Sequence, residues 1–172
     1  MQKVKPLKRF GQNYLQDKNT IQKIVDIFSP KEDDLIIEIG PGQGALTKYL
    51  SDKSKKYFAI EIDKRVIDDL INNFPNVIFI NQDFLTINLY ETVKHLISEN
   101  SKIRIIGNIP YNITSPILFK LIENRNIIND ALLMTQHEVA KRIVAKPNTK
   151  DYSILSVLLN YFTTPEYCFK IS

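Results

Sequence analysis

The chain has 172 residues, of which 44% are hydrophobic and 24% charged, and its formal net charge is +4. These values are typical of one soluble globular domain and exclude a disordered, collagen-like or disulfide-stapled protein. One cysteine and two histidines exclude a Cys/His zinc cluster. No apolar run reaches the ~18 residues of a membrane span and no signal peptide is recognisable, so we expect a cytoplasmic protein.

The N-terminus carries the excess positive charge. Its four basic residues are Lys3, Lys5, Lys8 and Arg9, and no acidic residue lies among them. A basic arm on a neutral body indicates a polyanionic partner such as nucleic acid. A solvated terminal segment is the alternative, and these charges taken alone favour it. We interpret residues 1–16 as a basic arm on a single domain, residues 1–172, and take Lys8 and Arg9 as candidate RNA contacts.

Short apolar runs alternate with segments of helical periodicity along the whole chain. In chain order we expect a helix over 17–28, a strand over 35–39, a helix around 46–50, a strand over 57–62, a helix around 66–71, a strand over 77–80, a helix around 93–97, a strand over 102–106, a helix that Ser115 caps and Pro116 begins, a strand over 130–135, helices over 138–145 and 152–162, and a sixth strand over 166–171. This order predicts an α/β fold with a doubly wound, mostly parallel sheet. Ligands of such sheets bind beyond the carboxyl ends of the strands.

Three of the predicted strand ends carry residues suited to a nucleoside. The first strand runs into a loop with glycines at positions 40, 42 and 44, a spacing that differs from the G-x-G-x-x-G of dinucleotide sites. Glu61 ends the second strand and can accept hydrogen bonds from both ribose hydroxyls. After the third strand, Asp83 can accept from an adenine amino group and Phe84 can cover the ring. A tight turn with exposed acids is the alternative.

The fourth strand ends in Asn108-Ile109-Pro110-Tyr111. The Asn108 side-chain oxygen and a nearby backbone carbonyl can accept both N–H groups of an exocyclic amine, while Tyr111 stacks on the base. An aromatic amine is a poor nucleophile because its lone pair is delocalised, and two such acceptors favour the pyramidal, nucleophilic geometry. A turn that ends the strand is the alternative, because Asn and Pro are common turn residues.

One further basic stretch follows the fifth strand. Lys141, Arg142, Lys146 and Lys150 either face phosphates or form a solvated helix face. We take Lys141 and Arg142 as candidate RNA contacts.

Taken together, these motifs resemble those of the ribosomal RNA adenine N6,N6-dimethyltransferases. The resemblance covers essentially the whole chain, and its ordered motifs are 10–15 (FGQNYL), the 38–44 loop, Glu61, Asp83, 108–111, 136–142 (QHEVAKR) and 152–157 (YSILSV). The last two are more similar to the small-subunit (KsgA-type) enzymes than to the large-subunit enzymes of macrolide resistance. The fold implied is a Rossmann-like class I methyltransferase.

The resemblance also implies a cofactor, a substrate and a site. S-adenosylmethionine would be converted to S-adenosylhomocysteine without a metal. The residues implied to line the cofactor are Asn13, Leu15, Gly40, Glu61, Asp83 and Asn108, and we add Gly42, Gly44 and Phe84 from the strand-end argument. Asn108, Pro110 and Tyr111 would present the target, one of two adjacent adenosines near the 3′ end of small-subunit rRNA in a pre-30S particle. We expect no membrane partner, and we expect a monomer.

The resemblance has one departure. Family members continue with an F-x-P-x-P-K-V loop, a further strand and a small helical domain, whereas this chain stops at Ser172. We therefore expect a chain that lacks the C-terminal part. Three alternative functions remain: a non-catalytic RNA-binding assembly factor, a large-subunit enzyme and a nicotinamide-dependent oxidoreductase. The glycine spacing disfavours the last of these.

Overall fold

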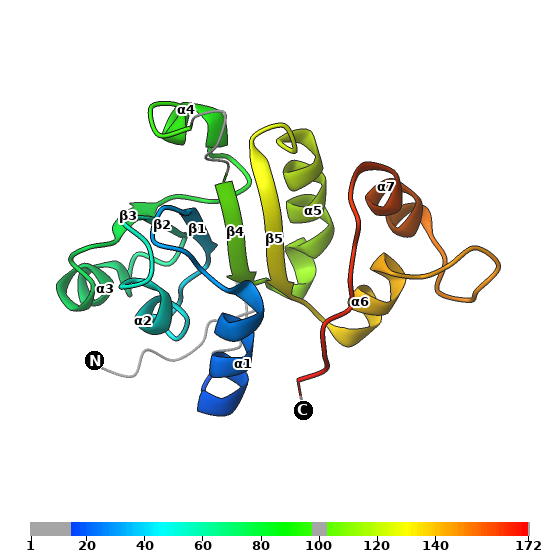
Figure 1. The fold of residues 1–172 in the computed structure, drawn as a ribbon, viewed down its shortest axis with the longest axis horizontal. Helices are drawn as coiled ribbons and strands as arrows, with labels where there is room; N and C mark the ends of the chain where they lie inside the picture. The colour runs from blue at the N-terminus through cyan, green and yellow to red at the C-terminus, as the bar shows by residue number, and fades with distance from the viewer. Residues whose placement is uncertain (1–14, 98–102, 172) are drawn as a thin grey trace.

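A computed structural model describes residues 15–97 and 103–171. Its order of elements is α1 (Lys18–Phe28), β1 (Leu35–Ile39), α2 (Thr47–Leu50), β2 (Lys56–Glu61), α3 (Ile67–Asn73), β3 (Ile78–Asn81), α4 (Leu89–Val93), β4 (Ile103–Asn108), the 3₁₀-helix η2 (Tyr111–Ile113), α5 (Thr114–Glu123), β5 (Ile128–Met134), α6 (His137–Ile143) and α7 (Ile154–Phe162) (Figure 1). No helix in the described part of the chain is both long and apolar enough to span a membrane.

The five strands of the described residues form one parallel sheet in the order β3-β2-β1-β4-β5. The chain leaves β1 toward one edge and returns to the other side at β4, so the switch point of this doubly wound sheet lies between β1 and β4. In the register, Ile39 lies opposite both Ile60 and Gly107. The carboxyl ends of the three central strands therefore reach the same level of the sheet.

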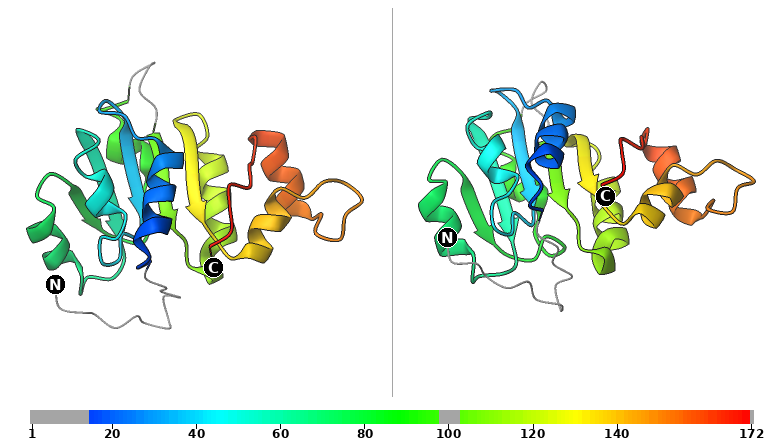
Figure 2. Two further views of the ribbon diagram at one scale, coloured as in Figure 1. Left: turned by 60° about the horizontal axis from the view of Figure 1, so that its bottom comes forward. Right: turned by 90° about the horizontal axis from the view of Figure 1, so that it is seen from below.

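Each face of the sheet is covered by its own apolar cluster. Leu35, Ile37 and Ile39 of β1 pack toward α4 and α5, whereas Ile36 packs toward α1 and α2. The alternation follows from the period of two in a strand, and burial on both faces explains why β1 is apolar at nearly every position. Two further views show α1 and α5 on opposite faces of the sheet (Figure 2).

The start of α1 agrees with the sequence. Asp17 caps the helix, because its side chain accepts a hydrogen bond from the backbone N–H of Thr20 at 2.8 Å. The buried face consists of Ile21, Ile24, Val25 and Phe28, the four residues at helical spacing.

Three details of the predicted elements are wrong. Residues 166–171 form no strand, because this segment makes no backbone ladder among the described residues; its side chains pack instead, with Phe169 under the ammonium of Lys23 at 4.2 Å. The helix expected around 93–97 lies elsewhere: α4 spans Leu89–Val93, because Asn88 caps it by accepting from the N–H of Glu91 at 3.1 Å, and residues 94–97 are not helical.

The third error concerns α5, which begins at Thr114 rather than after Ser115. The Thr114 hydroxyl donates to the carbonyl of Pro110 at 3.1 Å and extends the helix back to η2. Pro116 lies in the first turn, where its missing N–H leaves no helical bond unmade.

Candidate cofactor and substrate site

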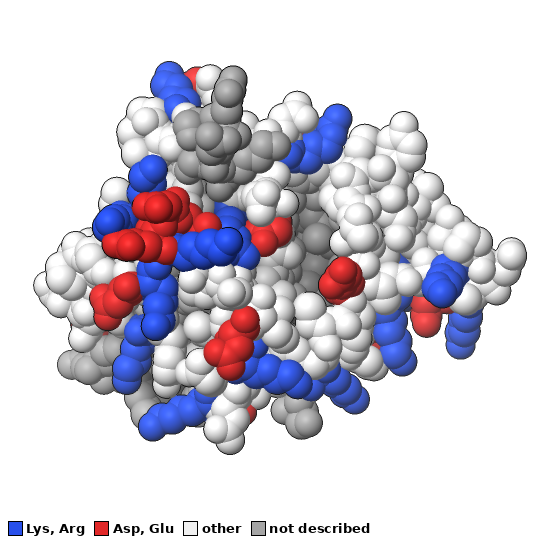
Figure 3. Space-filling view, viewed as in Figure 1, with Lys and Arg blue, Asp and Glu red and all other residues white. Residues whose placement is uncertain are grey.

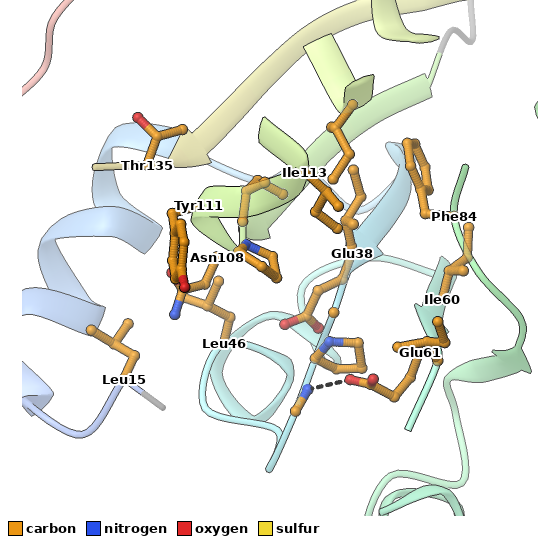
Figure 4. Close-up of a pocket in the computed structure, with 18 of the residues that line it drawn as sticks. Leu15, Glu38, Leu46, Ile60, Glu61, Phe84, Asn108, Tyr111, Ile113 and Thr135 are labelled. Atoms are coloured by element: carbon orange, nitrogen blue, oxygen red, sulfur yellow. Dashed lines mark hydrogen bonds between the residues drawn. The ribbon is translucent and has the colours of Figure 1, made fainter. Parts of the chain in front are cut away.

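A cavity of about 470 Å³ lies at the carboxyl ends of the central strands. The segments that line it include 38–43, 60–62, 82–85, 108–113 and 135–137. Figure 4 shows Glu61, Ile60 and Phe84 on one side of this cavity, and Asn108, Tyr111 and Leu46 on the other. Its volume is within the range of small-molecule sites, and its position is the one expected for a doubly wound sheet.

The glycine loop forms part of the cavity wall. Gly40 has φ +65°, a conformation that favours glycine, and a Cβ atom there would have no neighbour within 4 Å. Gly40 and Gly42 line the cavity, but Gly44 does not. A Cβ on Gly44 would lie 2.7 Å from Cε2 of Phe74, so this glycine permits close packing against α3.

Glu61 is buried and held by the backbone. One carboxylate oxygen accepts from the N–H of Gly42 at 2.9 Å (Figure 4), and the other accepts from the N–H of Asp63 at 2.8 Å. The side-chain amide of Asn81 donates to the Glu61 carbonyl at 2.7 Å. Burial raises the pKa of Glu61, and the two backbone hydrogen bonds partly oppose that rise. Each oxygen keeps a second lone pair, so the fixed carboxylate can still accept hydrogen bonds from a diol.

The turn after β3 places an acid and an aromatic ring in the same wall. Asp83 accepts from the N–H of Leu85 at 2.9 Å, and the N–H of Thr86 donates to the Asp83 carbonyl at 3.0 Å. Phe84 is buried in the cluster under α4 and α5, and it also lines the cavity. The turn therefore offers one carboxylate and one flat apolar surface to a ligand.

The end of β4 forms the opposite wall. Asn108 is the last residue of the strand, and the N–H of Ile109 still donates to the Met134 carbonyl at 2.9 Å. Asn108, Pro110 and Tyr111 all line the cavity. Tyr111 is 56% exposed although it is aromatic, so its ring is accessible to a flat ligand.

Glu38 was missed as a site residue in the sequence. Its carboxylate lines the cavity and accepts from the hydroxyls of Thr47 at 2.6 Å and Tyr57 at 2.7 Å. Burial raises the pKa of Glu38 to about 7, against the opposing effect of these two hydrogen bonds. An acid within a continuous apolar strand was the signal that could have identified it, because a buried carboxyl needs partners.

The remaining candidates differ in their position relative to the cavity. Leu15 lines the cavity, and so do Thr135, Gln136, His137 and Ile171, which the sequence did not indicate. Lys141 and Arg142 are exposed on α6 and do not line it. Figure 3 shows basic and acidic side chains interspersed over one face of the molecule. The candidates Lys8, Arg9 and Asn13 lie outside the described residues.

Solved structures define the class of this fold. The chain is similar to a dimethyladenosine transferase from Plasmodium falciparum, with a TM-score of 0.71 and 29% identity over 86% of this chain and 52% of that one. It is also similar to the 23S rRNA methyltransferase ErmE, with a TM-score of 0.64 and 32% identity over 81% of this chain and 52% of that one. The fold and its strand-end cavity therefore define a Rossmann-like methyltransferase domain, as the sequence predicted.

The family follows from the sequence comparisons. Residues 4–171 match the model of the ribosomal RNA adenine dimethylase family. A relative named ribosomal RNA small subunit methyltransferase A, from Chlorobium phaeobacteroides, is 46% identical over 95% of this chain. One of the same name from Francisella tularensis subsp. novicida is 49% identical over 92% of this chain. The chain belongs to the ribosomal RNA adenine dimethylase family, and it spans 59% and 61% of the length of these two curated relatives.

Proposed function

We propose that this chain is the methyl-transferring domain of an enzyme that dimethylates adenine N6 in small-subunit rRNA, with S-adenosylmethionine as the methyl donor. The observation that carries the proposal is that one cavity collects the glycine loop, Glu61, Asp83, Asn108 and Tyr111 from four different strand ends. The names of the relatives at 46% and 49% identity support the small subunit as the source of the RNA.

The residues on one side of the cavity fit the cofactor. The open space beside Gly40 lets a ligand approach the backbone closely. The Glu61 carboxylate, fixed by Gly42 and Asp63, would accept from the two ribose hydroxyls, and Asp83 would accept from the adenine amino group. S-adenosylmethionine, when bound, supplies a methyl group that is already activated by its positively charged sulfur.

The residues on the other side would position the target adenine. The Asn108 side chain and a backbone carbonyl of the same turn would accept from the two N–H groups of N6, and Tyr111 would stack on the ring. This arrangement directs the lone pair of N6 toward the cofactor side of the cavity. Catalysis would then come from orientation and from acceptors matched to the transition state. After one transfer an N–H is lost, so the space beside Asn108 must admit a methyl group.

The RNA contacts would lie outside the cavity. Lys141 and Arg142 on α6 are exposed, and α6 begins at His137, which lines the cavity. They would bind phosphates of a pre-30S particle, with Lys8 and Arg9 of the basic arm as further contacts. We propose that the protein acts in the cytoplasm, as a monomer, on this particle.

One alternative substrate has an observation in its favour. The similarity to ErmE, at 32% identity, is consistent with a large-subunit RNA substrate. The higher identity to relatives named for the small subunit favours the first proposal.

Methyl transfer to isolated immature small subunits and large subunits tests the proposal. The chain and a form of the relatives' full length are each incubated with radiolabelled S-adenosylmethionine, and the RNA is digested and analysed for N6,N6-dimethyladenosine. We expect product in small subunits with the long form, and calorimetric binding of S-adenosylmethionine but not NAD by both forms. Product only in large subunits would favour the alternative substrate, and binding without product would favour an assembly factor.

A further inference from the structure

Lys120 connects α5 to the turn that follows β3. Its ammonium donates to the carbonyl of Leu85 at 2.9 Å and to the carbonyl of Ile87 at 2.6 Å. The same ammonium lies 5.7 Å from the centre of the Phe84 ring. One side chain from a distant helix therefore contacts three residues of the turn, of which Phe84 and Leu85 line the cavity.

The turn's own hydrogen bonds fix its shape but not its position. Asp83 binds the N–H of Leu85 at 2.9 Å, whereas Lys120 binds the carbonyl of the same residue. Leu85 is thus held on one side by the acid that faces the cavity and on the other by α5. The N–H and the carbonyl of Leu85 belong to adjacent peptide planes, so Lys120 anchors the same residue whose N–H the Asp83 carboxylate accepts.

The environment of Lys120 is unfavourable for a charge. Burial lowers the pKa of Lys120, and the carboxylates of Glu123 and Asp83 act in the opposite direction. The apolar residues Ile117 and Leu121 of the same helix already pack against Phe84 and Ile87. Packing alone would hold α5 near the turn, so the charged group adds orientation of the two carbonyls.

We propose that Lys120 is a positioning residue that fixes the wall formed by Asp83, Phe84 and Leu85, and thereby sets the affinity and selectivity for the adenine of the cofactor. Lys120 does not line the cavity and acts through Leu85 and Ile87. The inference rests on the proposed function, because it takes this wall as the adenine side of the S-adenosylmethionine site.

The test measures binding of S-adenosylhomocysteine and S-inosylhomocysteine, in which oxygen replaces the adenine amino group. Calorimetry is applied to the unmodified protein, Lys120→Met, Lys120→Arg and Lys94→Met. Lys94 is a matched control, because it lies just after α4, is half exposed and pairs with Glu91 instead of the turn. We expect Lys120→Met to bind S-adenosylhomocysteine about tenfold more weakly, about 1.4 kcal/mol. In Lys120→Met the ratio of the affinities for S-adenosylhomocysteine and for the inosine analogue should fall toward one. Lys120→Arg should keep most of the affinity and most of this ratio.

The outcomes separate this inference from the proposed function. General loosening of the fold would weaken both ligands equally, so an unchanged preference in Lys120→Met overturns the positioning role. Unchanged affinity for both ligands overturns it as well. If Lys120→Met does not fold, the preference measured with Lys120→Leu, which also removes the donor group, decides the matter in the same way. If the unmodified protein binds neither ligand, the proposed function fails first.

Discussion

The carboxylate of Glu61 accepts the backbone N–H of Gly42 at 2.9 Å, which joins the end of β2 directly to the loop that follows β1. The same carboxylate accepts from the N–H of Asp63 at 2.8 Å. Two backbone donors thus define the orientation of the acid. A ligand diol would meet a carboxylate that needs no reorientation, which lowers the entropy lost on binding.

Replacement of Glu61 tests this arrangement. We expect Glu61→Ala to weaken binding of S-adenosylmethionine by about 1.5–3 kcal/mol, the range for hydrogen bonds to a charged group. Glu61→Gln keeps one acceptor oxygen and should lose less. Isothermal titration calorimetry gives both values, and circular dichroism reports whether each variant is folded. Unchanged affinity in a folded Glu61→Ala variant would remove this residue from the site.

The buried carboxyl of Glu38 predicts a pH dependence of stability. Burial raises its pKa from 4.5 to about 7. Between these pH values the folded state binds more protons than the unfolded state, so the free energy of unfolding falls as the pH rises. The stabilisation that the protonated Glu38 carboxyl adds to the folded state is complete below pH 4.5 and is lost above about pH 7. The raised pKa of Glu61 acts in the same direction.

Urea unfolding at several pH values between 4.5 and 7.5 measures this dependence. Glu38→Gln keeps an acceptor for Thr47 and Tyr57 but cannot titrate. We expect a smaller decline of stability with pH in this variant, with a residual slope from Glu61. An identical slope in both proteins would contradict the assignment.

Asn108 and Tyr111 should affect different steps of the reaction. Loss of one preorganised polar contact predicts that Asn108→Ala lowers the single-turnover methylation rate by ~10²–10³ at saturating cofactor. Tyr111→Ala should lose stacking of roughly 1–3 kcal/mol, and Tyr111→Phe should keep most of the activity because the ring suffices. The measurement uses small subunits and a form of the relatives' full length. A near-native rate for Asn108→Ala would leave this strand end with a structural role only.

Gly44 should affect stability and not the ligand. A Cβ there would lie 2.7 Å from Phe74, and the backbone φ of +78° is unfavourable for alanine. Overpacking and the left-handed conformation predict a loss of about 2–4 kcal/mol in the free energy of unfolding of Gly44→Ala. Thermal unfolding is compared between Gly44→Ala and the double variant Gly44→Ala/Phe74→Leu. The difference measures how much of the lost stability comes from the clash with Phe74. The cofactor affinity of the folded fraction should change little. A loss of affinity without a loss of stability would place Gly44 in the site.

The basic residues should control the salt dependence of RNA binding. Each lost phosphate contact on a single strand lowers the log–log slope by roughly 0.7, so Lys141→Ala with Arg142→Ala should lower it by about 1.4. Deletion of residues 1–9 should lower the slope separately, and neither change should alter cofactor affinity. Fluorescence anisotropy over a range of salt concentrations provides the slopes. An unaltered slope would identify the residues concerned as solvated surface.

Most of the fold could be predicted from local pattern. The continuous apolar run of β1 and the helical spacing around Ile24 and Phe28 report burial directly, and the structure confirms both. The segment 166–171 (EYCFKI) also contains aromatic and β-branched residues, yet it is not a strand, because a strand exists only where a neighbour offers hydrogen bonds. Side-chain pattern alone does not report that neighbour.

The site, like the fold, could be predicted only in part from the sequence. The strand ends predicted from spacing do meet in one cavity, because parallel strands in register bring their carboxyl ends together. Glu38, His137 and Lys120 were missed as contributors to the cavity or its walls. Their roles depend on partners distant in sequence, such as Tyr57 for Glu38 and Leu85 for Lys120, and these partners are known only once the chain is folded.

The order of strands also determines when the protein can first become functional during its synthesis. Among the described residues β1 is the first strand to be made, yet its residue Leu35 pairs with both Lys56 and Ile103. A nascent chain can pair β1 with β2 early, but the other edge of β1 stays open until β4 has left the ribosome. Since the cavity needs the ends of β1, β2 and β4, ligand-assisted folding cannot begin before that point. Until then the chain exposes an apolar strand edge, a feature that makes folding intermediates prone to aggregation.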